Sequence, residues 1–279
     1  MIENARSVSE LPAPEAVLLM SIFDRFRLDG KKLFITGGSR GLGREMALAI
    51  ADAGADVILV ARDSEQLEIT ANEIRAFGRT AWTINKDVSK PEECEEACRI
   101  ALTEAGPIDI LINNVGGRRE NVPTEEMSLA MWQGLIDLNL TNTFICCKMI
   151  GAAMIENKIK GRVINIASIN GMVAGRNIAG RHYETAKAGV IQLTRCLAVD
   201  WARYGITANT ICPGLFMTAP NVRWSKDHPQ VIEEFLHNVP TGEFGRPEDI
   251  GPLAVYLAGD STRYMTGASL VIDGGYTCW

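Results

Sequence analysis

Short apolar runs alternate with longer helix-forming segments along nearly the whole chain, and this alternation limits the fold more than any other feature. The runs lack helical periodicity, whereas the segments between them have it. Strands that alternate with helices at this interval form a parallel sheet covered by helices on both faces. The predicted strands are 32–36, 56–60, 80–85, 108–112, 162–167, 207–211 and 269–272, and the main predicted helices are 64–77, one from near residue 91, 125–157, 181–204 and 247–258.

One domain accounts for this pattern. With 279 residues, of which 47% are hydrophobic, the chain is long enough to bury the core of one large α/β domain. We expect a doubly wound parallel sheet of about seven strands, a Rossmann fold, over residues 28–279. Residues 1–27 are expected to form a loose N-terminal arm. Residues 215–240 are irregular and amphipathic, which is typical of a mobile lid over a substrate.

Composition argues against several classes of function. The formal net charge is -6 and no Lys/Arg-rich run occurs, so we expect no nucleic-acid partner. No apolar run approaches the roughly 20 residues that span a bilayer, and the first residues do not resemble a secretory signal. The seven cysteines are scattered without a CxxC or His-spaced cluster, which predicts neither a metal site nor disulfides and favours the cytoplasm.

A glycine-rich turn separates the first predicted strand from the helix that follows. Such a turn leaves backbone N–H groups uncovered at a helix N-terminus, where the helix dipole also favours an anion. It predicts a site for nucleotide phosphates, unless it is only a tight connection without a ligand. The spacing, Gly37-x3-Gly41-x-Gly43, differs from the GxGxxG fingerprint. The residues of this turn predicted to contact a cofactor are Gly37, Ser39, Arg40, Gly41, Leu42 and Gly43.

The end of the second predicted strand bears on the choice of cofactor. In a dinucleotide-binding fold an acidic residue here binds the ribose 2′-hydroxyl of NAD, whereas arginine binds the 2′-phosphate of NADP. Arg62 lies at this point, and Arg40 can approach the same phosphate from the glycine turn. The pair favours NADP(H), while Asp63 leaves NAD(H) open. Alternatively, both arginines are solvated loop residues.

Polar residues also follow the third and fourth predicted strands. Asp87, before Val88, accepts a hydrogen bond from an adenine amino group, caps the helix that begins near Pro91, or does both. Asn113 and Asn114 directly follow a buried strand, where unsatisfied amides are costly. We expect these amides to tie the strand end to its neighbours or to border the cofactor.

Tyr183 and Lys187 lie four residues apart in a predicted helix, and therefore on one face of it. A neighbouring ammonium favours the phenolate and lowers the pKa of a phenol from its ordinary value of about 10, so this pair can transfer a proton. Ser168 ends the fifth predicted strand, where open α/β sheets place ligands. Asn139, in the interior of the predicted helix 125–157, needs a polar partner.

The order and intervals of these motifs resemble those of the short-chain dehydrogenase/reductase family, over roughly residues 28–279. The matching motifs are Thr36-Gly37-x3-Gly41-x-Gly43, Asp87, Asn113-Asn114-Val115-Gly116, Asn139, Ser168, Tyr183-x3-Lys187 and Pro213-Gly214. Two departures are Val115, where alanine is usual, and the 15-residue interval from Ser168 to Tyr183, which is a little longer than usual.

The resemblance implies a role for each of four residues. Tyr183 would be the general acid/base that interconverts a ketone and an alcohol, Lys187 would lower its pKa and bind the nicotinamide ribose, and Ser168 would hydrogen-bond the substrate oxygen. Asn139 would hold a water that links Lys187 to solvent. Hydride comes from the nicotinamide, so no metal is needed. A homotetramer is also implied. The remaining cofactor contacts implied are Arg62, Asp87, Val88, Asn114, Val115, Gly116, Tyr183, Lys187, Pro213, Gly214 and Thr218.

Several basic residues are expected to border the substrate. They are Arg118, Arg119, Arg176, Arg181 and His182. If they converge, the site suits an anionic small molecule such as a sugar acid or a phosphopantetheine arm; otherwise they face water or a neighbouring subunit. The resemblance is to the branch that contains gluconate 5-dehydrogenase and 3-oxoacyl-carrier-protein reductases. A non-catalytic NADP-binding protein of this fold is the alternative of another class.

Overall fold

Seven parallel strands form one sheet in the order β3-β2-β1-β4-β5-β6-β7 in a computed structural model that describes residues 21–175 and 178–279. Every neighbouring pair is parallel. The order reverses direction between β1 and β4, which creates a crevice at the carboxyl ends of these strands. The strands are β1 (Lys32–Thr36), β2 (Asp56–Ala61), β3 (Ala81–Asn85), β4 (Ile110–Asn113), β5 (Arg162–Ile166), β6 (Thr207–Pro213) and β7 (Ser269–Ile272).

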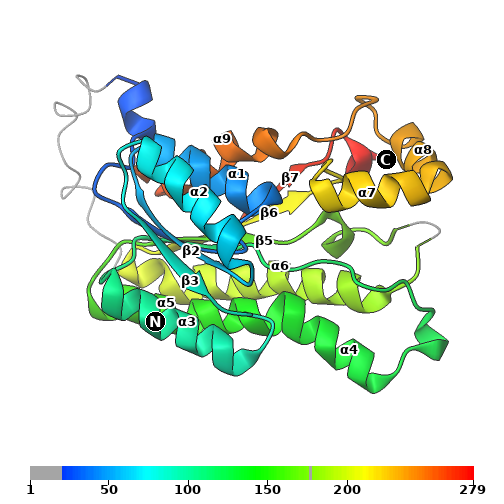
Figure 1. Ribbon diagram of the computed structural model, residues 1–279, viewed down its shortest axis with the longest axis horizontal. Coiled ribbons are helices and arrows are strands. Elements are labelled where there is room, and N and C mark those ends of the chain that lie inside the picture. Colours follow the sequence, from blue (N-terminus) through cyan, green and yellow to red (C-terminus); the bar gives the residue numbers. More distant parts are fainter. Residues whose placement is uncertain (1–20, 176–177) are drawn as a thin grey trace.

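Helices cover both faces of the sheet (Figure 1). One face carries α1 (Gly41–Asp52), α2 (Ser64–Ala76) and α9 (Gly251–Ala258); the other carries α3 (Pro91–Glu104), α5 (Asn142–Glu156) and α6 (Arg181–Trp201). Successive side chains of β1 point to opposite faces, so Leu33 and Ile35 enter the core under α1 while Phe34 enters the core under α3 and α5. The predicted fold class, a doubly wound parallel sheet, is confirmed.

The long helix predicted over 125–157 is divided in the structure. It begins at Leu129, where the Ser128 side chain accepts a hydrogen bond from the backbone N–H of Met131. α4 (Leu129–Ile136) continues through a π-helical turn, η5 (Asp137–Thr141), into α5. By length and composition the whole stretch is a candidate membrane span, although no apolar run of that kind was expected. Its apolar character is explained by packing, because α5 lies against α3 and α4 against α6.

Two other predicted segments differ from the structure. Within 215–240, predicted to be irregular, the chain forms α7 (Ala219–Asp227) and α8 (Pro229–His237). Residues 1–20 of the predicted arm lie outside the described residues. The rest of the arm is ordered, because Phe23–Phe26 form a short 3-10 helix and the Phe26 ring packs 6.2 Å from that of Tyr256.

Candidate active site

The turn between β1 and α1 is built for an anion. Gly37 and Gly41 have positive φ angles of 70° and 57°, which side-chain-bearing residues rarely adopt. A Cβ on Gly43 would lie 2.2 Å from the Gly37 carbonyl oxygen, so this position also excludes a side chain. Arg40 occupies the N-cap position of α1 but makes no side-chain hydrogen bond to the first turn. The first-turn N–H groups are therefore left for a ligand such as a pyrophosphate.

The residues expected to distinguish NADP from NAD have separate partners. Arg62 pairs with Asp87 at 3.6 Å and remains half exposed, and Arg40 is exposed. The Asp63 carboxylate accepts from the N–H of Gln66 and so caps α2. Asp63 is the acidic residue that kept NAD(H) as an alternative cofactor, and its carboxylate has a structural role as the N-cap of α2. This arrangement fits a 2′-phosphate bound by the two arginines.

Asp87 does not cap the helix near Pro91, as one sequence interpretation proposed. Its carboxylate accepts from the backbone N–H and hydroxyl of Ser89, and Lys90 occupies the N-cap position of α3. The turn that follows Asp87 places Ser89, and not the first turn of α3, within hydrogen-bond distance of the carboxylate. Val88 is buried beneath α3. The adenine contact stays a prediction.

Asn114 joins the end of β4 to the glycine turn. Its side-chain nitrogen donates to the carbonyls of Thr36 and Gly37 at 3.1 and 3.3 Å, and its backbone N–H donates to the Thr36 hydroxyl. Asn113 instead points into the protein, where it donates to Asn165 at 2.8 Å. The sequence left open whether this pair ties strands together or borders the cofactor. Asn113 ties strands, whereas Asn114 does so at the edge of the predicted phosphate site.

Tyr183 and Lys187 lie one turn apart near the start of α6, as predicted, and Ser168 follows β5 beside them. The Lys187 nitrogen lies 6.0 Å from the centre of the Tyr183 ring and donates to the Ile166 carbonyl at 2.8 Å. The oxygen of the Ser168 hydroxyl accepts from the Asn170 N–H, while the hydroxyl also hydrogen-bonds the Tyr183 phenol. Ser168 and Lys187 are both buried, while Tyr183 is half buried.

Burial dominates the proton affinities of this pair. It raises the pKa of the Tyr183 phenol above its ordinary value, and the opposing effects of a hydrogen bond with Ser168 and of the Arg118 charge do not cancel the rise. Burial also lowers the pKa of Lys187 to about 8. The net direction for the phenol is opposite to that expected from the sequence, because desolvation outweighs the neighbouring cations.

Asn139 and Gly116 lie against the Lys187 ammonium. A Cβ on Gly116 would be 2.6 Å from the Asn139 side-chain oxygen and 2.8 Å from the Lys187 nitrogen. Asn139 sits in the π-helical turn and is fully buried; its side chain accepts from the N–H of Gly117 and donates to the carbonyls of Gly117 and Leu135. These bonds provide the polar partners that the sequence required. The water relay stays a prediction.

The segment after β6 meets the glycine turn. Pro213 ends β6, and Gly214 donates to the Ile272 carbonyl, where a Cβ would be only 2.8 Å from that of Asp273. Thr218 is the N-cap residue of α7, and its methyl group would be 3.4 Å from a Cβ on Gly41. The predicted lid therefore starts directly over the predicted phosphate site.

An ionic network that the sequence did not predict borders Tyr183. The Glu184 carboxylate accepts from Arg181 at 2.8 and 2.9 Å, from Arg118 at 3.3 Å, and from Asn170 and the Gly175 N–H. The Arg181–Glu184 spacing was a local signal that could have indicated part of it. The Arg118 contact spans 66 residues and left no such signal.

This network bears on the two alternatives that the sequence left open for the basic residues, an electropositive substrate pocket or solvated side chains. The Glu184 carboxylate offsets one of the two positive charges of Arg118 and Arg181, so the three side chains together keep a net charge of +1. Arg119 is exposed, and Arg176 lies outside the described residues. The His182 ring is 2% exposed and lies near Gly180, away from water.

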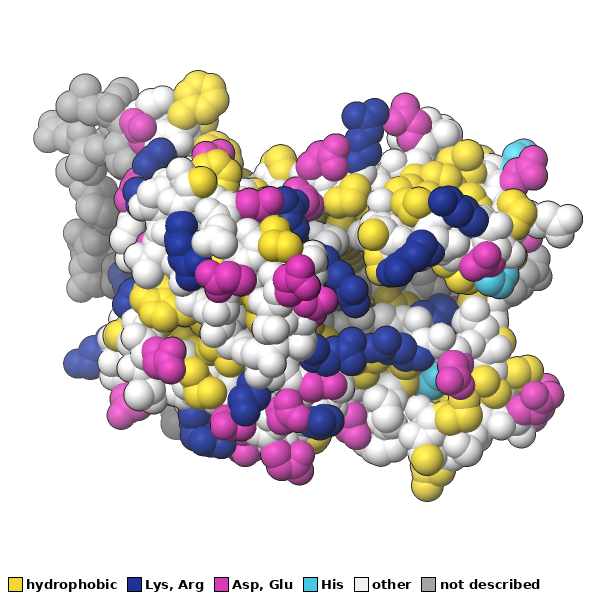
Figure 2. Space-filling model, in the orientation of Figure 1, with side chains coloured by type: hydrophobic (Ala, Val, Ile, Leu, Met, Phe, Trp, Pro, Cys, Tyr) yellow, Lys and Arg dark blue, Asp and Glu magenta, His cyan; other side chains and the backbone are white. Residues whose placement is uncertain are grey.

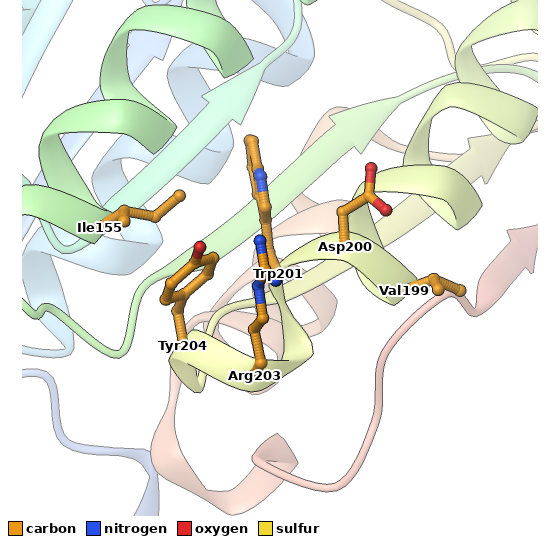
Figure 3. A pocket seen from close by; sticks show the side chains of 6 residues that line it. All are labelled: Ile155, Val199, Asp200, Trp201, Arg203 and Tyr204. Carbon is orange, nitrogen blue, oxygen red and sulfur yellow. The ribbon is translucent and has the colours of Figure 1, made fainter. Parts of the chain in front are cut away.

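Lys and Arg side chains gather along a hollow between the α7 and α4 regions in Figure 2, on the side where the strands end. Another surface hollow, shown in Figure 3, is lined by Trp201, Tyr204 and neighbouring residues at the far end of α6. It lies about 27 Å along that helix from Tyr183, at 1.5 Å per residue. It is therefore separate from the site described above.

Comparisons with known proteins agree with the fold and with the resemblance that the motifs of the chain indicated. A family model described as Enoyl-(Acyl carrier protein) reductase matches residues 37–277. Galactitol 2-dehydrogenase from Rhizobium johnstonii is 32% identical over 263 residues, which cover 93% of this chain and 100% of the relative.

Solved structures agree as well. A short-chain type dehydrogenase/reductase from Mycobacterium marinum is 35% identical, with a TM-score of 0.84 and coverage of 93% of this chain and 100% of the other. A gluconate 5-dehydrogenase from Burkholderia cenocepacia J2315, in complex with NADP and tartrate, is 32% identical, with a TM-score of 0.84 and coverage of 92% and 99%.

The glycine turn and the Tyr183–Lys187 pair lie at the same edge of this sheet. Together they define an oxidoreductase that uses a dinucleotide cofactor. The chain belongs to the short-chain dehydrogenase/reductase family, as its motifs indicated.

Proposed function

We propose that the protein is an NADP(H)-dependent oxidoreductase that interconverts a secondary alcohol and a ketone, with Tyr183 as the general acid/base. The observation that carries this proposal is the convergence of Ser168, Tyr183 and Lys187 at the carboxyl ends of the central strands, beside Gly116. An oxygen that gains negative charge during reduction needs preplaced hydrogen-bond donors, and this cluster offers two hydroxyls and an ammonium.

The cofactor fits the residues around the glycine turn. The uncapped N-terminus of α1 would hold the pyrophosphate, and Arg40 and Arg62 would bind the 2′-phosphate. Lys187 would bind the nicotinamide ribose. The NADP in the gluconate 5-dehydrogenase structure supports this choice. When bound, the nicotinamide supplies or accepts the hydride.

The chain's own residues then move the proton. The raised pKa of Tyr183 keeps the phenol protonated at neutral pH, which is the form that donates to a carbonyl oxygen. The Ser168 hydroxyl, which hydrogen-bonds the phenol in this structure, would donate its proton to the same carbonyl oxygen when a substrate is bound. In the oxidation direction the phenolate accepts the alcohol proton, and Lys187 can return it to solvent because burial places its pKa near neutrality, at about 8.

The substrate class is a polyol or a sugar acid. Galactitol 2-dehydrogenase and gluconate 5-dehydrogenase, both about one third identical to this chain, support it by name. The main alternative is a 3-oxoacyl-carrier-protein reductase, which the description of the family model favours. Glu184 offsets only one of the two positive charges of Arg118 and Arg181 and already accepts hydrogen bonds from both, so an anionic group on the substrate would need a further partner, for example on the 215–240 lid.

Purified protein with NADP+ or NADPH, offered polyols, sugar acids, keto-sugar acids and 3-oxoacyl thioesters, tests the proposal. We expect turnover with members of the first three groups and with NADP(H) in preference to NAD(H). Turnover of thioesters alone would favour the carrier-protein alternative. Nucleotide binding without turnover across the whole panel would favour the non-catalytic NADP-binding protein.

We also propose a cytoplasmic homotetramer. Exposed apolar side chains on the helices and last strand support contact surfaces: Phe144 on α5, Val199 on α6 and Val271 on β7 are 50%, 79% and 38% exposed. The mass of the native assembly in solution checks the subunit number. A monomer would contradict it.

A further inference from the structure

Arg118 lies closer to the Tyr183 ring than the lysine of the motif does. Its guanidinium carbon is 4.8 Å from the ring centre, compared with 6.0 Å for the Lys187 nitrogen. The Lys187 ammonium donates a hydrogen bond to the Ile166 carbonyl. A guanidinium over an aromatic face is an attractive arrangement that fixes the ring.

Arg118 is itself held by several contacts. It donates to the carbonyls of Ala179 and Gly180 at 2.6 and 3.3 Å and to Glu184 at 3.3 Å, and its side chain is 18% exposed. These partners belong to the loop before α6 and to its first turn, so the arginine connects the loop after β4 to both. A planar guanidinium suits this role because its donors have a fixed geometry.

Resting on the function proposed above, we propose that Arg118 is a positioning residue that fixes the Tyr183 ring and places a positive charge over the face of that ring. The phenolate that accepts a proton from an alcohol then forms next to a fixed cation. In this role Arg118 acts through Tyr183, whose ring it contacts.

The charges around the phenol act in opposite directions. Arg118 favours the phenolate and lowers the pKa of Tyr183, whereas the Glu184 carboxylate raises it. Arg181 pairs with Glu184 and so reduces that opposition. His182 is buried next to Tyr183 in the chain, and Cys212 faces Lys187. Among these groups, Arg118 is the cation whose removal changes the field at the phenol most directly.

The test compares Arg118→Gln and Arg118→Lys with Arg119→Gln, which removes the neighbouring, exposed arginine. In the oxidation direction, kcat/KM rises with pH through the apparent pKa of Tyr183. Loss of the Arg118 charge is expected to move that rise upward by about 1 pH unit, because a charge about 5 Å away shifts a pKa by between about 0.6 and 2.4 units at dielectric constants of 80 and 20. Arg118→Lys restores most of the shift, and Arg119→Gln leaves the profile unchanged.

A second readout separates this inference from the proposed function. The tyrosinate absorbance of each protein is titrated against the same protein carrying Tyr183→Phe, so that the difference reports Tyr183 without any substrate. An enzyme inactive on every substrate would defeat the proposed function, and the titration would still decide the role of Arg118. An unchanged pKa of Tyr183 in Arg118→Gln, or an equal shift in Arg119→Gln, would overturn the inference. Where Arg118→Gln does not fold, Arg118→Met, which keeps the aliphatic stem over the ring, carries the same expectation.

Discussion

Gly43→Ala is the sharpest perturbation of the nucleotide turn that the structure offers. The new Cβ would lie 2.2 Å from the Gly37 carbonyl oxygen and 2.5 Å from the Asn114 side-chain nitrogen. Both atoms are held, one by the backbone and the other by hydrogen bonds to Thr36 and Gly37. The turn must therefore open by about 0.8 Å to bring the first contact to the 3.0 Å that real Cβ atoms respect.

The magnitude follows from two opposing effects. Alanine in a helix gains up to about 1 kcal/mol over glycine, whereas overpacking costs about 1–3 kcal/mol, so we expect a net loss of about 1–2 kcal/mol in the free energy of unfolding. Because the shift displaces the phosphate-binding N–H groups, NADP+ affinity should fall at least about tenfold, or 1.4 kcal/mol.

Gly134→Ala is the matched control. Gly134 lies in α4, and a Cβ there meets nothing within 4 Å. It should stabilise the protein by about 0.5–1 kcal/mol and leave NADP+ binding unchanged. Urea unfolding and NADP+ titration of both variants check these values. If Gly43→Ala binds NADP+ as the wild type does and is as stable as Gly134→Ala, the account of the turn is wrong.

Three further predictions concern the same site. Arg40→Ala together with Arg62→Ala should weaken NADP+ binding about 10²-fold and NAD+ binding little, since two charge-assisted hydrogen bonds to a 2′-phosphate are lost; equal losses for both nucleotides would contradict it. Gly116→Ala should lower kcat at least about tenfold, because its Cβ would press on Lys187 at 2.8 Å, and an unchanged kcat would mean that the ammonium has room to move. Lys187→Met should be more stable than the wild type at pH 7, by up to about 3 kcal/mol in the free energy of unfolding. Burial lowers the pKa of Lys187 in the folded protein to about 8, so the buried ammonium destabilises the wild type at pH 7. Between pH 8 and the ordinary pKa of 10.5, Lys187 is protonated in the unfolded chain but not in the folded one, so the stability of the wild type rises with pH. The difference in stability between Lys187→Met and the wild type should therefore narrow by about 2 kcal/mol at pH 10. A difference that does not change with pH in urea unfolding would refute this prediction.

The elements that could be predicted are those specified locally. The strands β1, β2 and β4 are mostly buried apolar runs, so the fold class and the position of the glycine turn followed from the sequence. The Tyr183–Lys187 alignment needed only the helical repeat. The π-helical turn at Asn139 could not be predicted from the helical repeat. Its Asn139 side chain hydrogen-bonds Gly117, 22 residues earlier, and no local pattern reveals such a contact.

The electrostatics of the site depended on contacts between distant segments. The sequence predicted Arg118 near the substrate. Its hydrogen bonds to Glu184 and to the Ala179 carbonyl could not be predicted, because they form only when the loop after β4 meets the loop before α6. The pKa of Tyr183 was predicted in the wrong direction because the sequence shows the neighbouring cation but not the depth of burial. Within 215–240, which was predicted to be irregular and amphipathic, the chain forms two short helices.

The central claim is that Tyr183 transfers the proton. Tyr183→Phe removes the phenol oxygen and keeps the ring that Arg118 contacts. Single-turnover and steady-state rates with the best substrate, measured beside NADP+ affinity, test it most directly. We predict a loss in kcat of about 10²-fold or more with NADP+ affinity within about twofold of the wild type. Retained turnover in Tyr183→Phe would contradict the account.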